Sequence, residues 1–499
     1  DILDEYTDLV GKPGMPPLWS FGTWMSRITY FSEKEGYDVA ANIRKNKYPC
    51  DVIHFDTGWF DVDWQCDYKF SENRFQNPQQ MLKDLRSQGF HVCLWQLPYF
   101  TPKNRYFSEL IEKDMYVKNG NGELPYEDVV LDFSNPETVK WYQDKLAGLL
   151  NIGVSAIKVD FGEAAPLNGI YASGKSGWYE HNLYPVRYDM AVSEITKKLH
   201  NENIMWARAA WAGSQRYPLH WGGDAATTNT GLLGTLRAGL SFGLSGFSFW
   251  SHDISGFEST ATPDLYKRWC AFGLMSTHSR LHGSTSYRVP WLFDEESCDV
   301  VKFFTNLKCS LMPYIFQKSV EAHEEGTPVM RPMVFEFMND PAVPYLDQQY
   351  MLGDALLVAP VFREDKVAQY YLPEGTWTEL LTGETKEGGR WFQGTYDYFS
   401  MPLYVRENSI VVRGNCDTKP DYDYADHATV CVYQLKDAAE TRVSDIHGNT
   451  VFTVKAVKDG DAVKVSVEGA HTELKVEVFV GNEKKEAVLA ADANEVVVA

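Results

Sequence analysis

Short apolar runs alternate with longer amphipathic stretches over the first two-thirds of the chain. Runs of roughly four to eight apolar residues, bounded by turn-forming residues, are typical of strands buried on both faces. Eight such runs predict strands, at residues 18–24, 52–56, 91–97, 156–161, 204–208, 219–223, 246–251 and near 275–281.

The stretches between the early runs carry apolar residues at helical spacing. Residues 136–150 (PETVKWYQDKLAGLL) give the clearest pattern, with Pro136 at the first turn. Helices are predicted at residues 33–46, 78–87, 136–150 and 189–200. Strands that alternate with helices pair in parallel, and eight such units in roughly 250–300 residues fit a (β/α)8 TIM barrel of the α/β class.

The pattern changes at about residue 328. Short β-rich runs separated by turn signals follow, and after a polar link at 417–426 the chain alternates strictly between apolar and polar residues. This alternation is typical of half-buried antiparallel strands. We therefore predict a catalytic barrel at 1–327 and two C-terminal β-sandwich-like domains, a proximal one at 328–412 and a distal one at 413–499.

The composition indicates a large packed core under an acidic surface. Of 499 residues, 44% are hydrophobic and 23% charged, which excludes a disordered or collagen-like chain. The 47 basic and 68 acidic residues give a net charge of −21. This charge argues against a nucleic-acid partner, because phosphate contacts need clustered Lys and Arg. The 15 Trp and 28 Tyr suit sugar rings, although aromatic-rich cores explain most of them.

The sequence contains no signal for a membrane span, for secretion or for a metal site. No run of about 18 apolar residues occurs, so no membrane partner is predicted. Asp1 opens the chain without a signal peptide, which suggests a processed or trimmed start. The eight cysteines form no CxxC pair or zinc-site spacing, and several, such as Cys93, lie in apolar runs. These features favour a reducing, cytoplasmic location and predict no metal or organic cofactor.

Polar and aromatic side chains collect at the ends of the predicted strands. In a (β/α)8 barrel, the chemistry lies at the carboxyl ends of the strands. The candidates there are Asp56, Trp95, Lys158, Asp160, Glu163, Arg208, Trp221, Asp224, His252, Asp253, Arg280 and His282. Paired carboxylates cleave glycosidic bonds, aromatic rings stack on sugars, and Arg and His bind hydroxyl groups. The combination predicts a sugar-cleaving site.

Each candidate also has a purely structural interpretation. A strand-end aspartate is often a helix N-cap. Lys158 also fits a salt bridge, His282 a satisfied core histidine, and Trp95 and Trp221 the core. The functional interpretation prevails because several independent strand ends carry the same kinds of side chain. The two glycines before Asp224 also let the backbone approach a ligand closely.

Five segments carry a family resemblance: IKVDFGE, HWGGD, GLSGFSFWSHDISGFE, YKRWCAFGLMSTHSRLHGSTSYRVPW and QYMLGDALLVAPVF. They closely resemble glycoside hydrolase family 31, and especially its bacterial α-xylosidases. The resemblance runs from Pro17 to about Asp423 and is most specific between Gly239 and Trp291. The last 75 or so residues match the family only in general character.

The resemblance implies roles for individual residues. Asp160, in the KxDFGE motif, falls on the family's nucleophile, and Asp224, in the WGGD motif, on its acid/base. Asp56 falls on an aspartate that binds sugar hydroxyls, and Trp95 on a tryptophan that lines the ring. The family's other substrate-binding positions correspond to Lys158, Arg208, Trp221 and His282.

Two departures from the family pattern bear on these expectations. The family's usual N-terminal β-sandwich domain is absent from this chain, which starts almost at the barrel and is therefore a fragment or a shortened form. After Asp56 the family's α-xylosidases have Cys-Phe and its α-glucosidases typically Ile-Asp, whereas this chain has Thr57 and Gly58. Gly58 leaves space that favours a hexose, unless Tyr30, Phe31 or Trp59 fills it.

The predicted function is an exo-acting retaining α-glycosidase, with α-xylosides as the expected substrates. An α-glucosidase or α-galactosidase, a transglycosylase and an inactive carbohydrate-binding remnant are the alternatives. Retention predicts that the carboxyl groups of Asp160 and Asp224 lie about 5–5.5 Å apart. The expected partner is an oligosaccharide or a small α-glycoside, and the sequence leaves a homo-oligomer open.

Overall fold

The computed structural model describes residues 2–499 and contains the expected barrel. All strand pairs in its nine-stranded sheet are parallel, in the order β10-β11-β1-β2-β3-β6-β7-β8-β9. The strands are β1 (Thr23–Arg27), β2 (Val52–Phe55), β3 (His91–Gln96), β6 (Ala156–Val159), β7 (Trp206–Ala207), β8 (His220–Trp221), β9 (Trp250–Ser251), β10 (Asp253–Ile254) and β11 (Ser279–Leu281).

One interrupted strand closes this barrel. β9 pairs with β8, and β10, which begins two residues after β9 ends, pairs with β11. The two short strands together occupy the seventh of the eight barrel positions, counted along the chain. The (β/α)8 prediction is therefore confirmed, although the predicted strand at 246–251 is wrong in its limits, because it omits the continuation through Asp253 and Ile254.

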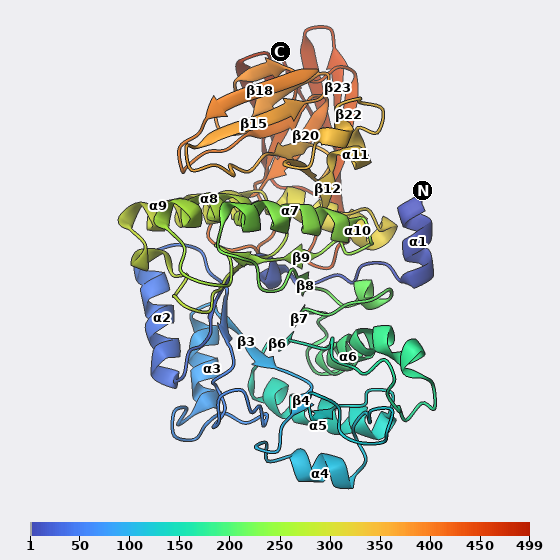
Figure 1. The fold of residues 1–499 in the computed structure, drawn as a ribbon. Helices are drawn as coiled ribbons and strands as arrows, with labels where there is room; N and C mark the ends of the chain where they lie inside the picture. The colour runs from blue at the N-terminus through green and yellow to red at the C-terminus, as the bar shows by residue number, and fades with distance from the viewer. Residues whose placement is uncertain (1) are drawn as a thin grey trace.

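Helices surround the strands (Figure 1). They are α2 (Glu33–Lys45), α3 (Pro78–Ser87), α4 (Phe107–Glu112), α5 (Pro136–Ile152), α6 (Gly177–His200), α7 (Asn229–Gly243), α8 (Pro263–Leu274), α9 (Glu295–Ser310) and α10 (Met312–Glu325). Local chemistry sets their ends. At α5, the side chain of Asn135 accepts a hydrogen bond from the backbone N–H of Glu137, Pro136 occupies the first turn, and Gly153 ends the helix at a φ of 119°.

Two further predicted elements differ from the observed ones in where they begin. Residues 18–21 form a 3-10 helix, and the strand starts only at Thr23, because a short buried apolar run has the same pattern in either structure. Helix α6 begins at Gly177 and continues through Pro185, whereas the prediction starts at residue 189. Proline usually marks a helix boundary, and here tertiary packing overrides that preference.

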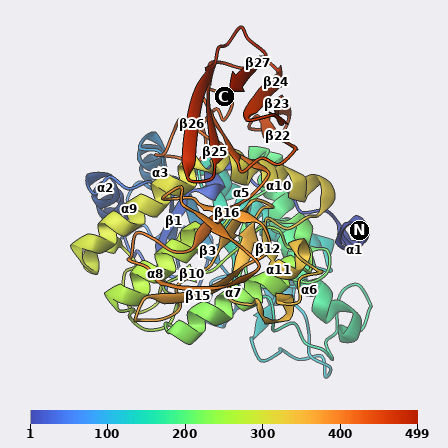
Figure 2. The same ribbon diagram turned by 90° about the horizontal axis from the view of Figure 1, so that it is seen from above.

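β-sheets follow the barrel, as predicted, and their strand pairs are antiparallel except for β21 and β25, which pair in parallel. A six-stranded sheet contains β12 (Met330–Pro332), β13 (Tyr350–Leu352), β14 (Leu356–Val358), β16 (Thr376–Glu379), β17 (Thr385–Glu387) and β19 (Leu403–Arg406), beside the pair β15 (Val367–Leu372) and β18 (Arg390–Thr395). Two four-stranded sheets come next, with β20 (Ser409–Arg413), β21 (Thr429–Tyr433), β25 (Leu474–Val480) and β26 (Glu483–Leu489) in one, and β22 (Ala438–Ser444), β23 (Thr450–Asp459), β24 (Ala462–Gly469) and β27 (Glu495–Val498) in the other. Figures 1 and 2 show the last sheets projecting from the barrel.

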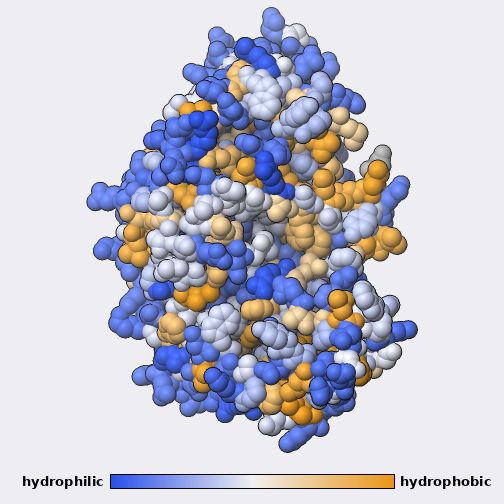
Figure 3. Space-filling model, viewed as in Figure 1, coloured by the Kyte–Doolittle hydropathy of each residue, from blue (hydrophilic) through white to orange (hydrophobic). Residues whose placement is uncertain are grey.

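The face of the molecule shown in Figure 3 is largely polar, with scattered apolar patches. The first helix, α1 (Ile2–Val10), lies at the edge of the molecule and exposes Ile2 and Leu9. Within residues 2–499, no helix combines the length and the hydropathy that crossing a bilayer requires.

Candidate active site

Parallel pairing brings the predicted polar residues to one end of the barrel. Asp56 directly follows β2, Asp160 directly follows β6, Arg208 follows β7, and His282 follows β11. Trp95 and Lys158 lie within β3 and β6 and are partners in the strand register. Because the carboxyl ends of parallel strands meet at one rim, these side chains lie close together.

The carboxylate of Asp160 is held by four polar contacts. Its Oδ2 accepts a 2.7 Å hydrogen bond from the indole N–H of Trp95 and lies 3.6 Å from Lys158 Nζ. Its Oδ1 lies 3.1 Å from Arg208 Nη1 and accepts a 2.8 Å hydrogen bond from the backbone N–H of Phe161. The side chain is buried. Two cations and two N–H donors therefore stabilise a negative charge at this position.

Asp56 forms a second buried cluster beside Asp160. Its Oδ2 lies 3.0 Å from Lys158 Nζ, 2.8 Å from His54 Nε2 and 4.0 Å from His282 Nε2. Burial alone would raise the pKa of Asp56, but the Lys158 charge and the His54 hydrogen bond outweigh it and lower the pKa to about 2. Asp56 is therefore a permanent carboxylate, and Lys158 is shared between the two aspartates.

His282 presents a free ring nitrogen to this cluster. Its Nδ1 is 2.7 Å from Ser26 Oγ, and its Nε2 has no hydrogen-bond partner within residues 2–499. Burial, followed by the charges of Arg280 and Lys158, lowers the pKa of His282 well below its ordinary value. The neutral ring can therefore exchange a hydrogen bond with a ligand hydroxyl group.

Arg208 and Trp221 form the wall beside Asp160. Arg208 also bonds Glu163 at 2.7 Å, and its guanidinium lies 4.4 Å from the ring centroid of Phe161. Trp221 is buried, with Lys158 Nζ 4.9 Å from its ring centroid. Its indole N–H has no acceptor within residues 2–499.

Asp224 occupies a different environment. It follows Gly222 and Gly223 on the loop after β8, and its side chain is exposed, with no hydrogen bond or ion pair within residues 2–499. The pKa of Asp224 is raised, first by partial removal from water and then by the charges of Asp253 and Asp160, which outweigh the opposing effect of Arg208. β7 separates β6 from β8 in the sheet, so Asp160 and Asp224 lie on strands adjacent but one.

Two contributors to the cluster were missing from the predicted set, His54 and Ser26, which hold Asp56 and His282. Arg280, which was among the candidates, forms a buried pair with Asp253. His54 had a detectable signal, because residues two apart on a strand face the same side, as His54 and Asp56 do. His252, in contrast, packs away from the cluster, with its ring stacked on Phe272 at 4.7 Å.

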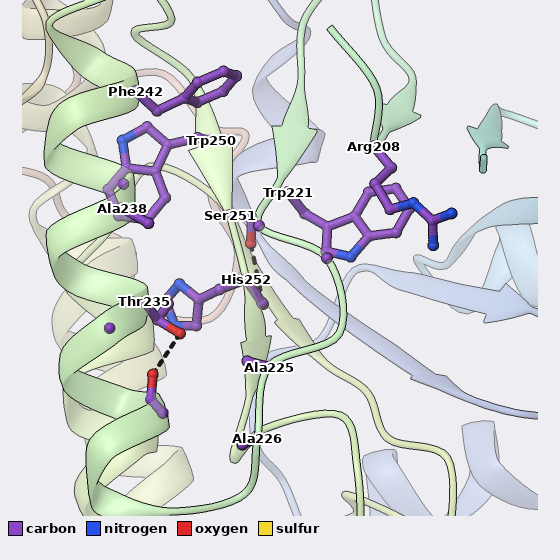
Figure 4. A pocket seen from close by; sticks show the side chains of 15 residues that line it. Arg208, Trp221, Ala225, Ala226, Thr235, Ala238, Phe242, Trp250, Ser251 and His252 are labelled. Atoms are coloured by element: carbon purple, nitrogen blue, oxygen red, sulfur yellow. Dashed lines mark hydrogen bonds between the residues drawn. The ribbon is translucent and has the colours of Figure 1, made fainter. Parts of the chain in front are cut away.

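A cavity of about 440 Å³ lies between helix α7 and strand β9 (Figure 4). Trp250 and His252 stand between the strand and the helix, and Arg208 and Trp221 lie on the opposite side of the strands. The lining of this cavity includes neither Asp160 nor Asp224. Its lining does include Arg208 and Trp221, so the cavity adjoins the cluster at the strand ends, and the two aspartates lie outside it.

The loop after Asp56 contains an aromatic ring beside Gly58. A Cβ atom at Gly58 would lie 2.5 Å from Phe31 Cε1 and 2.7 Å from Thr29 Cγ2. Phe31 comes from the loop between β1 and α2 and is 42% exposed. The space next to Gly58 is therefore occupied by Phe31, one of the three residues considered for it.

Comparisons with protein families match nearly the whole chain. The family 31 glycosyl hydrolase TIM-barrel domain matches residues 13–318, and the family 31 C-terminal domain matches residues 326–411. Residues 423–499 match a domain described as the alpha-xylosidase YicI C-terminal domain.

Individual relatives agree with these matches. Alpha-xylosidase XylQ of Lactiplantibacillus pentosus is 38% identical over 97% of this chain and 66% of its own length. An alpha-xylosidase of Emericella nidulans is 37% identical over 82% of this chain and 55% of its own length. The chain thus spans less than two-thirds of either relative.

A solved structure has a similar fold. The Flavobacterium johnsoniae family 31 dextranase, complexed with glucose, superposes with a TM-score of 0.86 at 28% identity, over 96% of this chain and 65% of its own. A mutant of that dextranase was solved with isomaltotriose.

Proposed function

The chain belongs to glycoside hydrolase family 31, and from this premise we propose that it is an exo-acting retaining α-glycosidase. Its substrates would be oligosaccharides or small α-glycosides with a terminal, non-reducing α-linked sugar. The observation that carries the proposal is the contrast between two aspartates at one barrel rim. Asp160 lies among two cations and two N–H donors, whereas the pKa of Asp224 is raised.

In the first proposed step, a carboxylate oxygen of Asp160 attacks the anomeric carbon. The bond from that carbon to the leaving oxygen breaks, and Asp224 gives its proton to that oxygen. Lys158 and Arg208 lie 3.6 Å and 3.1 Å from the carboxylate oxygens of Asp160 that make this attack. The raised pKa of Asp224 favours the protonated form that the leaving group requires.

In the second step, Asp224 accepts a proton from a water molecule whose oxygen bonds to the anomeric carbon. The ester bond to Asp160 breaks, which regenerates both aspartates and releases the sugar with its original anomeric configuration. These steps use only side chains of this chain and water. Substitution of Asp160 is therefore expected to abolish both steps, and substitution of Asp224 to slow each in proportion to its need for proton transfer.

We assign sugar binding to the buried residues around Asp160. Asp56 accepts hydrogen bonds from sugar hydroxyl groups, and neutral His282 offers its free Nε2. We also assign to Trp95 and Trp221, both buried around Asp160, the aromatic faces against which the sugar ring packs. Lys158 and Arg208 contact hydroxyl groups as well as Asp160, because each side chain has further N–H donors.

For the cleaved sugar we propose α-linked xylose. Xylose differs from glucose and galactose in lacking a hydroxymethyl group at C5, so a site selective for xylose must fill that volume. Phe31 is packed against Gly58 and supplies an aromatic side chain where the α-xylosidases of the family have Phe. The two α-xylosidase relatives at 37% and 38% identity support the same choice.

Aryl α-xyloside, α-glucoside and α-galactoside assayed in parallel test the sugar assignment. We expect the xyloside to give the highest kcat/KM. Phe31→Ala should raise the glucoside-to-xyloside ratio, and Phe31→Ala combined with Gly58→Phe should return it towards the wild-type value, because the aromatic ring is restored from the other loop. A wild type active only on hexosides would overturn the xylose assignment, and activity on no α-glycoside would overturn the glycosidase itself.

The division into three domains is also a proposal: a barrel at 1–327, a proximal β domain at 328–412 and a distal one at 413–499. The family matches at residues 13–318, 326–411 and 423–499 support this order. Strand β20 (Ser409–Arg413) bears on the second boundary, because it pairs with β21 of the distal sheet although most of its residues precede 413.

A further inference from the structure

Trp64 is a large, half-exposed side chain at the rim of the candidate site. It lies on the loop between β2 and α3, and 45% of its surface is accessible to solvent. Its ring centroid is 5.5 Å from that of Trp95 at an interplanar angle of 81°, and 6.4 Å from that of Phe161 at 73°. Trp95 donates its indole hydrogen bond to Asp160, so only one ring separates Trp64 from the proposed nucleophile.

The backbone holds Trp64 in an unfavourable conformation. Its φ is 67°, in the left-handed region that a bulky side chain rarely occupies. Its N–H donates a 3.2 Å hydrogen bond to the carbonyl of Thr57, which folds the loop back towards Asp56. Trp59 anchors the same loop by donating a 2.8 Å hydrogen bond to the carbonyl of Trp95. Strained residues of this kind cluster at ligand sites, where the surrounding structure enforces them.

The position of Trp64 suits a ligand ring outside the buried part of the site. Trp95 is fully buried beside Asp160, whereas Trp64 packs against Trp95 and still exposes nearly half of its surface. In exo cleavage the terminal sugar binds innermost and the leaving group extends towards solvent. A flat, half-exposed indole at that point offers the apolar face on which sugar and aromatic rings stack.

We propose that Trp64 is the platform for the leaving-group half of the substrate, a second sugar ring or an aromatic ring beyond the bond that is cleaved. This inference rests on the proposed glycosidase function and adds a leaving-group site to it. The strained backbone at Trp64 is then the cost of presenting the indole to that site. Trp64 contributes to binding and takes no part in bond making or proton transfer.

Two substrates separate this role from a structural one. In 4-nitrophenyl α-xyloside the leaving group carries a ring, and in α-xylosyl fluoride it is a single atom. Trp64→Ala should lower kcat/KM about tenfold on the aryl xyloside, mainly by raising KM, and change it less than about twofold on the fluoride. Trp64→Phe, which keeps an aromatic face, should recover most of the loss.

Trp64→Gly adds a stability readout. Glycine adopts a φ of 67° without strain and alanine does not, so Trp64→Gly should melt no lower than Trp64→Ala while it loses the same activity on the aryl substrate. Lys47→Gly, at a φ of 56° at the end of α2, should be equally tolerated and keep full activity on both substrates. Trp391→Ala is the control for removing an exposed indole, because Trp391 is 52% exposed and lies 5.7 Å from Tyr371 in the proximal β domain.

Equal losses of kcat/KM on the two substrates in Trp64→Ala would overturn the proposed role of Trp64. An unchanged KM for the aryl xyloside in the same variant would also overturn it. So would a Trp64→Gly variant that keeps the wild-type kcat/KM on the aryl xyloside, because no indole would then be needed for the leaving group. Wild-type turnover of α-xylosyl fluoride establishes the glycosidase independently of these variants. A negative result at Trp64 therefore removes the leaving-group site and leaves the proposed function standing.

Discussion

Asp160 is buried at the end of β6 among Trp95, Lys158 and Arg208, whereas Asp224 is exposed on the loop after β8 with no bonded partner within residues 2–499. A nucleophile must stay ionised and aimed at one carbon atom, which fixed donors and cations achieve. An acid/base must gain and lose a proton in each cycle, and permanent hydrogen bonds to its carboxylate would oppose protonation. The two environments thus match the two proposed roles.

The largest expected effect is on Asp160. Asp160→Ala should lower kcat/KM by about 10,000-fold or more on every α-glycoside, because no other group can form the covalent intermediate. Steady-state assays on an aryl α-xyloside and α-xylosyl fluoride measure the loss. Added azide should restore no α-glycosyl azide. A residual activity that depends strongly on the leaving group would contradict the nucleophile assignment.

Asp224→Ala should give a loss that depends on the leaving group. An alkyl α-xyloside needs protonation and should lose roughly 1,000-fold in kcat/KM, whereas a 4-nitrophenyl α-xyloside should lose tenfold or less in the first step. Azide should then restore turnover and give the α-glycosyl azide, because it needs no base to attack the intermediate. If Asp160→Ala and Asp224→Ala respond alike, the contrast between the two aspartates is not functional.

The roles of Asp160 and Asp224 can be predicted from the sequence, but the contacts around the two side chains cannot. The strand pattern and the KxDFGE and WGGD segments identify Asp160 and Asp224 because both lie at the carboxyl ends of predicted strands. The bonds from Trp95 and Arg208 to Asp160 depend on strand order and register, which link residues 65 and 48 positions away in the chain. The φ of Trp64 and the packing of Phe31 on Gly58 arise from loop folding, for which the sequence has no periodic signal.

The two glycines before Asp224 test how its loop positions the carboxyl group, because within residues 2–499 Asp224 lacks the side-chain contacts that hold Asp160. Gly223 has a φ of 76°, so Gly223→Ala introduces strain of about 1 kcal/mol and should displace Asp224. We expect roughly a five- to tenfold fall in kcat on an alkyl α-xyloside. Gly222→Ala is the matched control, because its Cβ would meet no atom within 4 Å, and it should change kcat less than about twofold. Equal effects would show that backbone conformation does not position Asp224.

Arg208 links the two aspartates, since it contacts Asp160 and lowers the pKa of Asp224 against the other influences. Activity requires protonated Asp224, so kcat/KM should fall as pH rises through the pKa of Asp224. Arg208→Gln removes a positive charge that favours the carboxylate form of Asp224. The fall of kcat/KM at high pH should therefore move to higher pH by up to about one unit. This shift does not depend on how far the substitution lowers the rate itself. A pH profile on the alkyl xyloside, whose leaving group needs protonation, measures this fall of kcat/KM, and a shift to lower pH would contradict the assignment.

The most direct test is to trap the covalent intermediate. 5-Fluoro-α-xylosyl fluoride has a good leaving group, which speeds the first step, and a ring fluorine that slows both steps, so the glycosyl-enzyme should accumulate. Mass spectrometry of the intact protein should show one added fluoroxylosyl group, and peptide mapping should place it on Asp160. A label on any other residue would contradict the account. So would turnover without a label that releases the sugar with inverted configuration, because Asp160 would then not be the nucleophile of a retaining enzyme.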